Sequence, residues 1–154
     1  MTVAKEKPRS NGLDMGGLDA LMGFHLRCAQ IAAFESFKDY LRPHGLSPGQ
    51  LGTLYLIAAN PGATQSAVAD ALLFDRSTMV QIIDQLEARA LVVREASAHD
   101  RRSHALRLTP GGVQLTEQLA GVVAQHEAQI GRGLSAEERQ TLIRLLARVH
   151  GAAA

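Results

Sequence analysis

The spacing of apolar residues between Thr64 and Thr109 changes from the period of a helix to the period of a strand. In two short stretches apolar residues recur every three or four positions, and in the two stretches that follow they alternate with polar residues. This pattern predicts two short helices followed by a β-hairpin. The apolar stripes consist of Ala67, Val68, Ala71 and Leu72 in the first helix and Met79, Ile82, Ile83, Leu86 and Ala90 in the second.

Each of these helices is preceded by a residue that can cap it. Thr64 stands before the first apolar run, and Asp75 stands before the second. The Asp75 carboxylate can accept the backbone amide of Ser77 or Thr78, and the positive end of the helix dipole favours its charge. The sequence therefore predicts helices that begin directly after residues 64 and 75.

The second helix keeps a polar face when its apolar stripe is buried. This face consists of Arg76, Ser77, Gln81, Asp84 and Gln85. Base edges in the DNA major groove present donors and acceptors at fixed positions, which small polar side chains at the start of a helix can read. We expect bases to be contacted by Arg76, Ser77, Thr78 and Gln81, and phosphates to be held at the start of the first helix by Thr64, Gln65 and Ser66.

The predicted hairpin has a basic tip. Residues 91–95 and 104–109 have the composition and alternation of strands, and the loop between them carries His99, Asp100, Arg101 and Arg102. We expect Arg101 and Arg102 to enter the minor groove, where narrow A·T tracts concentrate negative potential. Asp100 would be repelled by phosphate, so we expect it to pair with an arginine and hold the loop in shape.

Longer helical stretches flank this segment. Residues 18–42 have apolar side chains on two faces, which one small neighbour cannot cover. A serine and a proline begin another helix near residue 47, a threonine and a proline begin a long helix near residue 109, and a capping box begins the last helix at residue 135. A compact winged helix does not need these outer helices, so we expect them to form a symmetric dimer interface.

The predicted fold is mainly α with a small β-hairpin. It has a winged helix-turn-helix lobe at residues 47–109 and a helical dimerisation layer formed by residues 18–45 and 110–150. We expect residues 18–154 to form a single domain. Residues 1–17 are polar and rich in glycine, and we expect them to be a disordered tail.

Composition limits the other functions that the chain can have. The 154 residues include one cysteine, which fits a reducing cytoplasm, and no apolar run approaches the length of a membrane span. No zinc-ligand spacing, phosphate-binding glycine loop or nucleophile motif occurs, so we expect no metal, no cofactor and no enzymatic activity. The net charge of +1 is a weak argument for nucleic acid, but residues 89–109 concentrate five arginines around the predicted wing.

Four short motifs of this segment stand out: Asp75-Arg76-Ser77-Thr78, Asp84-Gln85-Leu86-Glu87, Asp100-Arg101-Arg102 and Leu108-Thr109-Pro110-Gly111-Gly112. Together they resemble the pattern of the MarR (multiple antibiotic resistance regulator) family of winged-helix transcription factors. The resemblance implies a homodimer that binds a palindromic operator on double-stranded DNA, most simply as a repressor. It also departs at one position, because members usually have glycine where this chain has Ala90. A left-handed turn costs alanine more than glycine, so we expect a different turn before Leu91.

The resemblance also implies a small aromatic or anionic effector, bound between the first, second and fifth helices. The residues that these helices would offer are His25, Arg27, Cys28, Phe34, Tyr55 and His126. An arginine and a histidine beside aromatic rings suit an aromatic carboxylate or an acyl-coenzyme A thioester.

Other interpretations stay open at this stage. The candidate effector residues could equally be core and ordinary polar positions. Cys28 could act as a redox sensor, although its apolar neighbours favour a buried, inert thiol. The nearly neutral charge also leaves open a winged-helix module that docks on protein without binding DNA.

Overall fold

The computed structural model describes residues 12–96 and 104–151. By its contacts the chain divides into two compact units, Met1–Glu35 and Ser36–Ala154. The wing-tip residues Asp100, Arg101 and Arg102 lie outside the described residues, as does most of the predicted tail, residues 1–11.

The first unit contains a short turn of 3-10 helix and the start of a long helix. The turn is η1 (Leu18–Ala20), and the helix is α1 (Met22–Leu41), which continues into the second unit. The side chain of His25 joins the two, because its Nε2 lies 2.8 Å from the carbonyl oxygen of Asp19. The apolar residues Ile31 and Phe34 are each about half exposed, so this part of α1 presents an apolar face.

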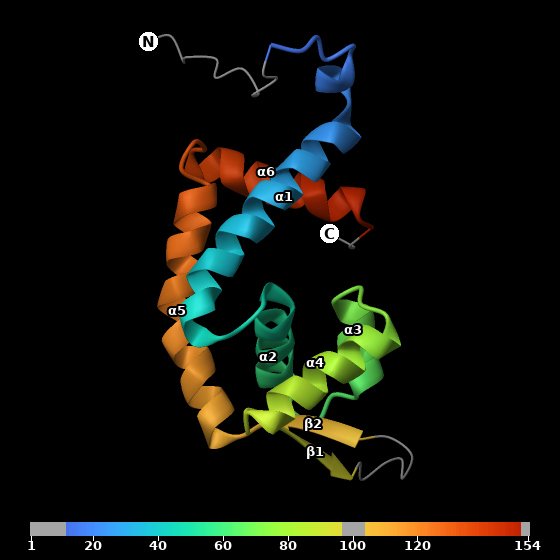
Figure 1. Cartoon of the computed structure of the whole chain (residues 1–154), viewed down its shortest axis with the longest axis vertical. Coiled ribbons are helices and arrows are strands. Elements are labelled where there is room, and N and C mark those ends of the chain that lie inside the picture. The colour runs from blue at the N-terminus through green and yellow to red at the C-terminus, as the bar shows by residue number, and fades with distance from the viewer. Residues whose placement is uncertain (1–11, 97–103, 152–154) are drawn as a thin grey trace. The chain divides into compact units, whose positions relative to one another are not determined.

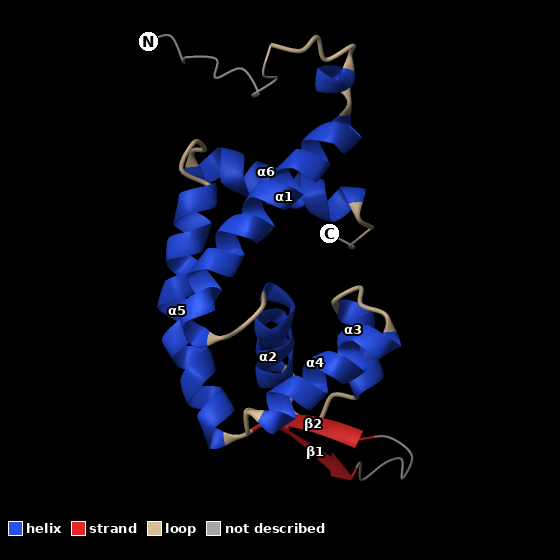
Figure 2. Ribbon diagram, in the orientation of Figure 1, coloured by secondary structure: helices blue, strands red, loops and turns tan. Residues whose placement is uncertain are grey.

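The second unit has the predicted order of helices and strands (Figures 1 and 2). After the end of α1 come η2 (Arg42–His44), α2 (Pro48–Ala59), α3 (Gln65–Ala71), α4 (Arg76–Ala88), β1 (Val92–Ala96), β2 (His104–Leu108), α5 (Pro110–Ile130) and α6 (Ala136–Val149). The strands pair antiparallel, with Val92 opposite Leu108 and Ala96 opposite His104. The predicted fold class, mainly α with a small hairpin, is therefore confirmed.

A single apolar core holds α2, α3, α4 and the hairpin together. The segment before α3 also pairs with β2, because Leu106 N donates to Ala63 O at 2.9 Å and Gly62 N donates to Leu106 O at 2.8 Å. This backbone pairing fixes the start of α3 against the strand that leads out of the wing. The buried apolar residues are Leu41, Leu46, Leu51, Leu54, Ile57, Val68, Ala69, Met79, Ile82, Ile83, Leu86, Leu91, Val92, Leu106 and Leu119.

The predicted caps begin the helices of this unit. The hydroxyl of Thr64 accepts the Ala67 amide at 3.2 Å, and that of Thr109 accepts the Gly112 amide at 3.0 Å. Capping boxes close the starts of α2 and α6, the second of them formed by Ser135 and Glu138 as predicted. Local polar side chains therefore fix where each element begins.

The turn after α4 corrects one expectation. Ala90 has a φ of 53° and adopts the left-handed conformation that glycine would take, so the expectation of a different turn was wrong. The amide of Leu91 donates to Leu86 O at 3.0 Å and that of Ala90 to Glu87 O at 2.8 Å, the pattern of a Schellman motif. The Thr109 hydroxyl also donates to Ala90 O at 2.6 Å. Burial of Leu91 and this tertiary hydrogen bond hold alanine in a conformation that its Cβ disfavours.

The last helix, α6, has an apolar face that is open to solvent. None of its residues is buried, and its large apolar side chains are all exposed by more than a third. They are Leu142, Ile143, Leu145, Leu146 and Val149. Among residues 12–96 and 104–151, no helix combines the length and apolar character needed to cross a membrane.

Candidate nucleic-acid interface

Asp75 organises the start of α4. Its carboxylate accepts the Thr78 amide at 2.8 Å and the Thr78 hydroxyl at 2.7 Å, and it also accepts the hydroxyl of Ser77. These hydrogen bonds, the Ser77 hydroxyl first and Thr78 next, hold the pKa of Asp75 well below its usual range. The carboxylate is ionised and can only accept, so both hydroxyls donate to it. Their free lone pairs are left to accept hydrogen bonds from outside.

The exposed face of α4 contains one large apolar residue, Val80, among polar ones. Arg76, Ser77 and Gln81 are exposed, as the sequence predicted, and Thr78 is half-buried. Val80 is 42% exposed and was not identified from the sequence. It follows Ser77 by three residues and Arg76 by four, so it lies beside both on the helix surface. This spacing from Ser77 and Arg76 is the feature of the sequence that could have placed Val80 on the exposed face.

Arg94 on β1 ties the hairpin to both helices of the helix-turn-helix. Its guanidinium donates to Asp84 at 2.7 Å, to Glu87, and to Gln65 Oε1 at 3.2 Å, while its backbone amide donates to Glu87 at 3.0 Å. The Arg94 side chain is only 21% exposed, which reduces the screening of these charges by water. The strand, α4 and α3 are thus joined through one cation.

The residues predicted to hold phosphates lie together at the start of α3. The Thr64 hydroxyl serves as the cap and lies 3.2 Å from the Ser66 hydroxyl, which is exposed. Gln65 shares its side-chain oxygen with Arg94, and its amide nitrogen is a further donor. The three residues surround a helix N-terminus, where backbone amides and the helix dipole favour an anion.

Two further arginines stabilise the lobe. Arg107 on β2 donates to Glu95 on β1 at 2.8 Å across the hairpin. Arg89 at the end of α4 donates to the carbonyl oxygens of Gly45 at 2.6 Å and His44 at 3.0 Å. Since Arg89 and Arg107 already have partners, they are weaker candidates for DNA contacts than the exposed Arg76.

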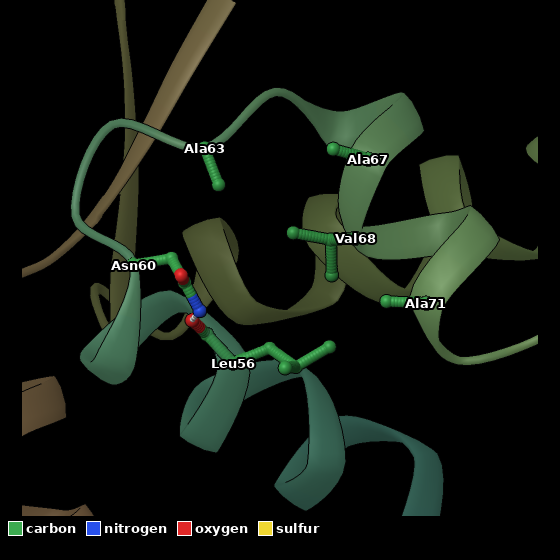
Figure 3. Close-up of a pocket in the computed structure, with 6 residues that line it drawn as sticks. All are labelled: Leu56, Asn60, Ala63, Ala67, Val68 and Ala71. Carbon is green, nitrogen blue, oxygen red and sulfur yellow. Dashed lines mark hydrogen bonds between the residues drawn. The ribbon is translucent and has the colours of Figure 1, made fainter. Parts of the chain in front are cut away.

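A hollow of about 200 Å³ lies between α2 and α3 (Figure 3). The Asn60 amide donates to the Leu56 carbonyl oxygen at 3.0 Å, which turns it toward its own helix. None of the six residues that line the hollow is charged, so it offers no charged group to an anionic effector. Its lining is formed by Leu56, Asn60, Ala63, Ala67, Val68 and Ala71.

The candidate effector residues fall in both units. His25, Arg27, Cys28 and Phe34 are exposed on α1 in the first unit. The sequence favoured a buried Cys28 thiol, whereas the structure of the single chain has Cys28 exposed.

The two remaining effector candidates lie in the second unit. Tyr55 is half-buried against the core. His126 is 3% exposed, stacks on Phe37 with ring centroids 4.3 Å apart, and meets the edge of Tyr40. In the described part of the chain no group of three or more His, Cys, Asp or Glu residues could hold a metal ion.

The known proteins that this chain is similar to are transcriptional regulators. A family model described as "MarR family" matches residues 44–103. A protein of Thauera aromatica, described as a transcriptional regulatory protein for the hcr operon, is 43% identical over 136 residues, which cover 88% of this chain and 82% of that protein. The transcriptional repressor CouR bound to a 23-mer DNA duplex is 38% identical, with a TM-score of 0.85, covering 90% of this chain and 98% of that one. CouR bound to p-coumaroyl-CoA is 37% identical, with a TM-score of 0.81, covering 90% and 97%.

Proposed function

This chain belongs to the MarR family of transcriptional regulators. From that premise we propose that it is a repressor that binds a palindromic operator as a homodimer. We propose further that it leaves the operator when an acyl-coenzyme A thioester binds. Its relative CouR is a repressor with structures on DNA and on p-coumaroyl-CoA. The proposed lobe is residues 47–109, and the proposed dimerisation layer is residues 18–45 and 110–150.

The start of α4 is the observation that carries the DNA-binding proposal. The hydroxyls of Ser77 and Thr78 both donate hydrogen bonds to Asp75, so their oxygens can accept hydrogen bonds from outside. Phosphate oxygens only accept, whereas the exocyclic amino groups of adenine and cytosine donate into the major groove. The two hydroxyls are therefore suited to base edges and unsuited to the backbone. Arg76 and Gln81 add a donor fork and an amide on the same exposed face.

Phosphate contacts would come from other parts of the lobe. Thr64, Gln65 and Ser66 surround the N-terminus of α3, and Arg101 and Arg102 belong to the wing tip that the sequence predicts to enter the minor groove. The exposed apolar faces of α6 and of the start of α1 provide area for a partner subunit. A dimer doubles the local arginine charge and sets the reading helices roughly 34 Å apart, one turn of DNA.

The effector proposal combines the candidate residues with the ligand of the relative. Arg27 and Phe34 are exposed on α1, where a cation and an aromatic face can take the phosphates and the acyl ring of an aromatic coenzyme A thioester. A ligand that binds a dimer with a different lobe spacing more tightly lowers DNA affinity by that preference alone.

A titration of fluorescent duplexes from the region upstream of the chain's own gene tests the DNA-binding role. The wild-type full chain should bind one duplex specifically, with an affinity that falls as salt rises. Arg102→Ala should weaken binding about tenfold or more if the wing makes a desolvated contact. Arg132→Ala, at an exposed arginine between α5 and α6 and outside the proposed DNA-binding lobe, is the matched control. Gel filtration should show that this variant keeps the oligomeric state of the wild type, and its affinity for the duplex should then equal that of the wild type. Absence of any specific duplex would favour a protein-docking module instead.

The same assay tests the effector. Addition of p-coumaroyl-CoA to the protein–DNA complex should release the duplex, while free coenzyme A and free p-coumarate separate the contributions of the two halves of the thioester. Release by the thioester and by neither half would support the proposal. Equal DNA affinity with and without aromatic thioesters, together with no heat of binding in calorimetry, would reject it.

A further inference from the structure

Val80 is the one large apolar side chain on the exposed face of α4. The buried stripe of this helix is complete without it, since Met79, Ile83 and Leu86 are fully enclosed and Val80 is 42% exposed. Valine also has a lower helix propensity than arginine, lysine, glutamine or glutamate, because its branched Cβ is restricted against the preceding turn. Neither the core nor the helix therefore benefits from valine at this position.

The neighbours of Val80 make it part of a base-reading surface. Ser77 lies one turn before both Val80 and Gln81, at spacings of three and four residues, so these three positions form a triangle on the helix surface. Two corners of the triangle carry hydrogen-bonding groups, with the Ser77 oxygen left as an acceptor by its bond to Asp75. The third corner offers two methyl groups. In the major groove, the apolar feature that a base pair presents is the 5-methyl group of thymine.

We infer that Val80 is a specificity-determining residue of this repressor, and that its side chain packs against the 5-methyl group of one thymine in each operator half-site. The inference rests on the proposed DNA-binding function and adds a base identity to it. The Ser77 acceptor one turn from Val80 is complementary to the amino group of an adenine or a cytosine. A step that contains both adenine and thymine therefore satisfies this part of the surface.

Removal of single methyl groups from the DNA tests the inference. A duplex is first selected by the wild-type full chain from random-sequence DNA, and each thymine is then replaced by uracil, which lacks only the 5-methyl group. We expect one sensitive thymine in each half-site. Its replacement in one half-site should lower the affinity about fourfold, which is the effect of losing contact with one buried methyl group, and replacement in both half-sites should lower the affinity about fifteenfold.

The variants then assign the contact to a residue. In Val80→Ala the same uracil duplexes should bind as well as the thymine duplex. In Val113→Ala, a control at a valine of 43% exposure on α5, the fourfold and fifteenfold losses should persist. Circular dichroism melting should show both variants folded, since alanine favours a helix.

Three outcomes separate the inference from the function on which it rests. Loss of the uracil effect in Val80→Ala alone supports the inference. Specific DNA binding with an equal uracil effect in wild type and Val80→Ala, or with no uracil effect at all, overturns it and leaves the proposed function intact. Failure of the wild-type chain to select any duplex removes the function and the inference together.

Discussion

Replacement of Ala90 by glycine should stabilise the protein. Ala90 has a φ of 53° at the position that follows the C-cap of α4. The left-handed conformation costs a residue with a Cβ about 1–2 kcal/mol. Glycine avoids this cost but loses about 0.5–1 kcal/mol more backbone entropy on folding than alanine does. The balance for Ala90→Gly is a gain of about 0.5–1 kcal/mol in the free energy of unfolding.

The backbone of this turn should not change in the variant. The amides of Ala90 and Leu91 donate within the Schellman motif, and the Thr109 hydroxyl donates to the Ala90 carbonyl, so all of these bonds involve backbone atoms that glycine keeps. The methyl group of Ala90 is exposed, so its removal creates no cavity. The change in stability therefore comes only from the two backbone terms, the cost of the left-handed conformation and the entropy lost on folding.

The matched control is Ala88→Gly, the same change at the last residue of α4, where the backbone is right-handed. It should destabilise the protein by about 0.5 kcal/mol. Thermal melting at one fixed protein concentration should place Ala90→Gly about 1–4 °C above wild type and Ala88→Gly below it. Equal destabilisation by both changes would show that the left-handed turn at Ala90 is not strained.

Two further predictions concern the side chains that hold the lobe. Arg94→Gln removes the cation from the partly buried Glu87 and should lower the free energy of unfolding, measured by urea denaturation, by about 1–3 kcal/mol. The double variant with Glu87→Gln should recover part of this loss. No recovery would contradict a charge effect. Asp75→Asn keeps a capping oxygen but removes a carboxylate whose pKa is lowered by the hydroxyl of Ser77 and by Thr78. Because its folded-state pKa lies below the unfolded value, the carboxylate's contribution is fully present above about pH 4 and is lost as pH falls toward the folded-state pKa. The urea midpoints of wild type and Asp75→Asn should therefore differ near neutral pH and converge on acidification, and a constant difference would refute the role of the charge.

The helix starts were predictable because each depends on residues within one turn. Thr64, Asp75, Thr109 and Ser135 cap helices through hydrogen bonds to residues three positions later, and such pairs can be recognised in sequence. The strands were predictable for a similar reason, since their alternation is local. The order and type of elements in the lobe therefore follow from short-range patterns.

The errors arose where a distant part of the chain decides the outcome. The turn at Ala90 depends on the Thr109 hydroxyl, which is 19 residues away in sequence. The exposure of Cys28 depends on whether anything covers its face of α1, which a helical pattern does not reveal. Val80 was missed because it was excluded from the polar face as an apolar residue, and its exposure became visible only when the core proved complete without it.

The Arg94 network resolves the difficulty that the sequence posed about charge. By composition α4 is acidic, since Asp84 and Glu87 follow a single arginine, and an acidic helix should be repelled from the major groove. Arg94 binds both carboxylates from the neighbouring strand, so the potential that the helix presents is less negative than its own sequence implies. The same guanidinium donates to Gln65 at the start of α3, and its strand leads directly into the wing. The cation that makes α4 compatible with DNA thus also fixes the base of the wing against the reading helix. A change that releases Arg94 should therefore weaken base contacts and wing contacts together.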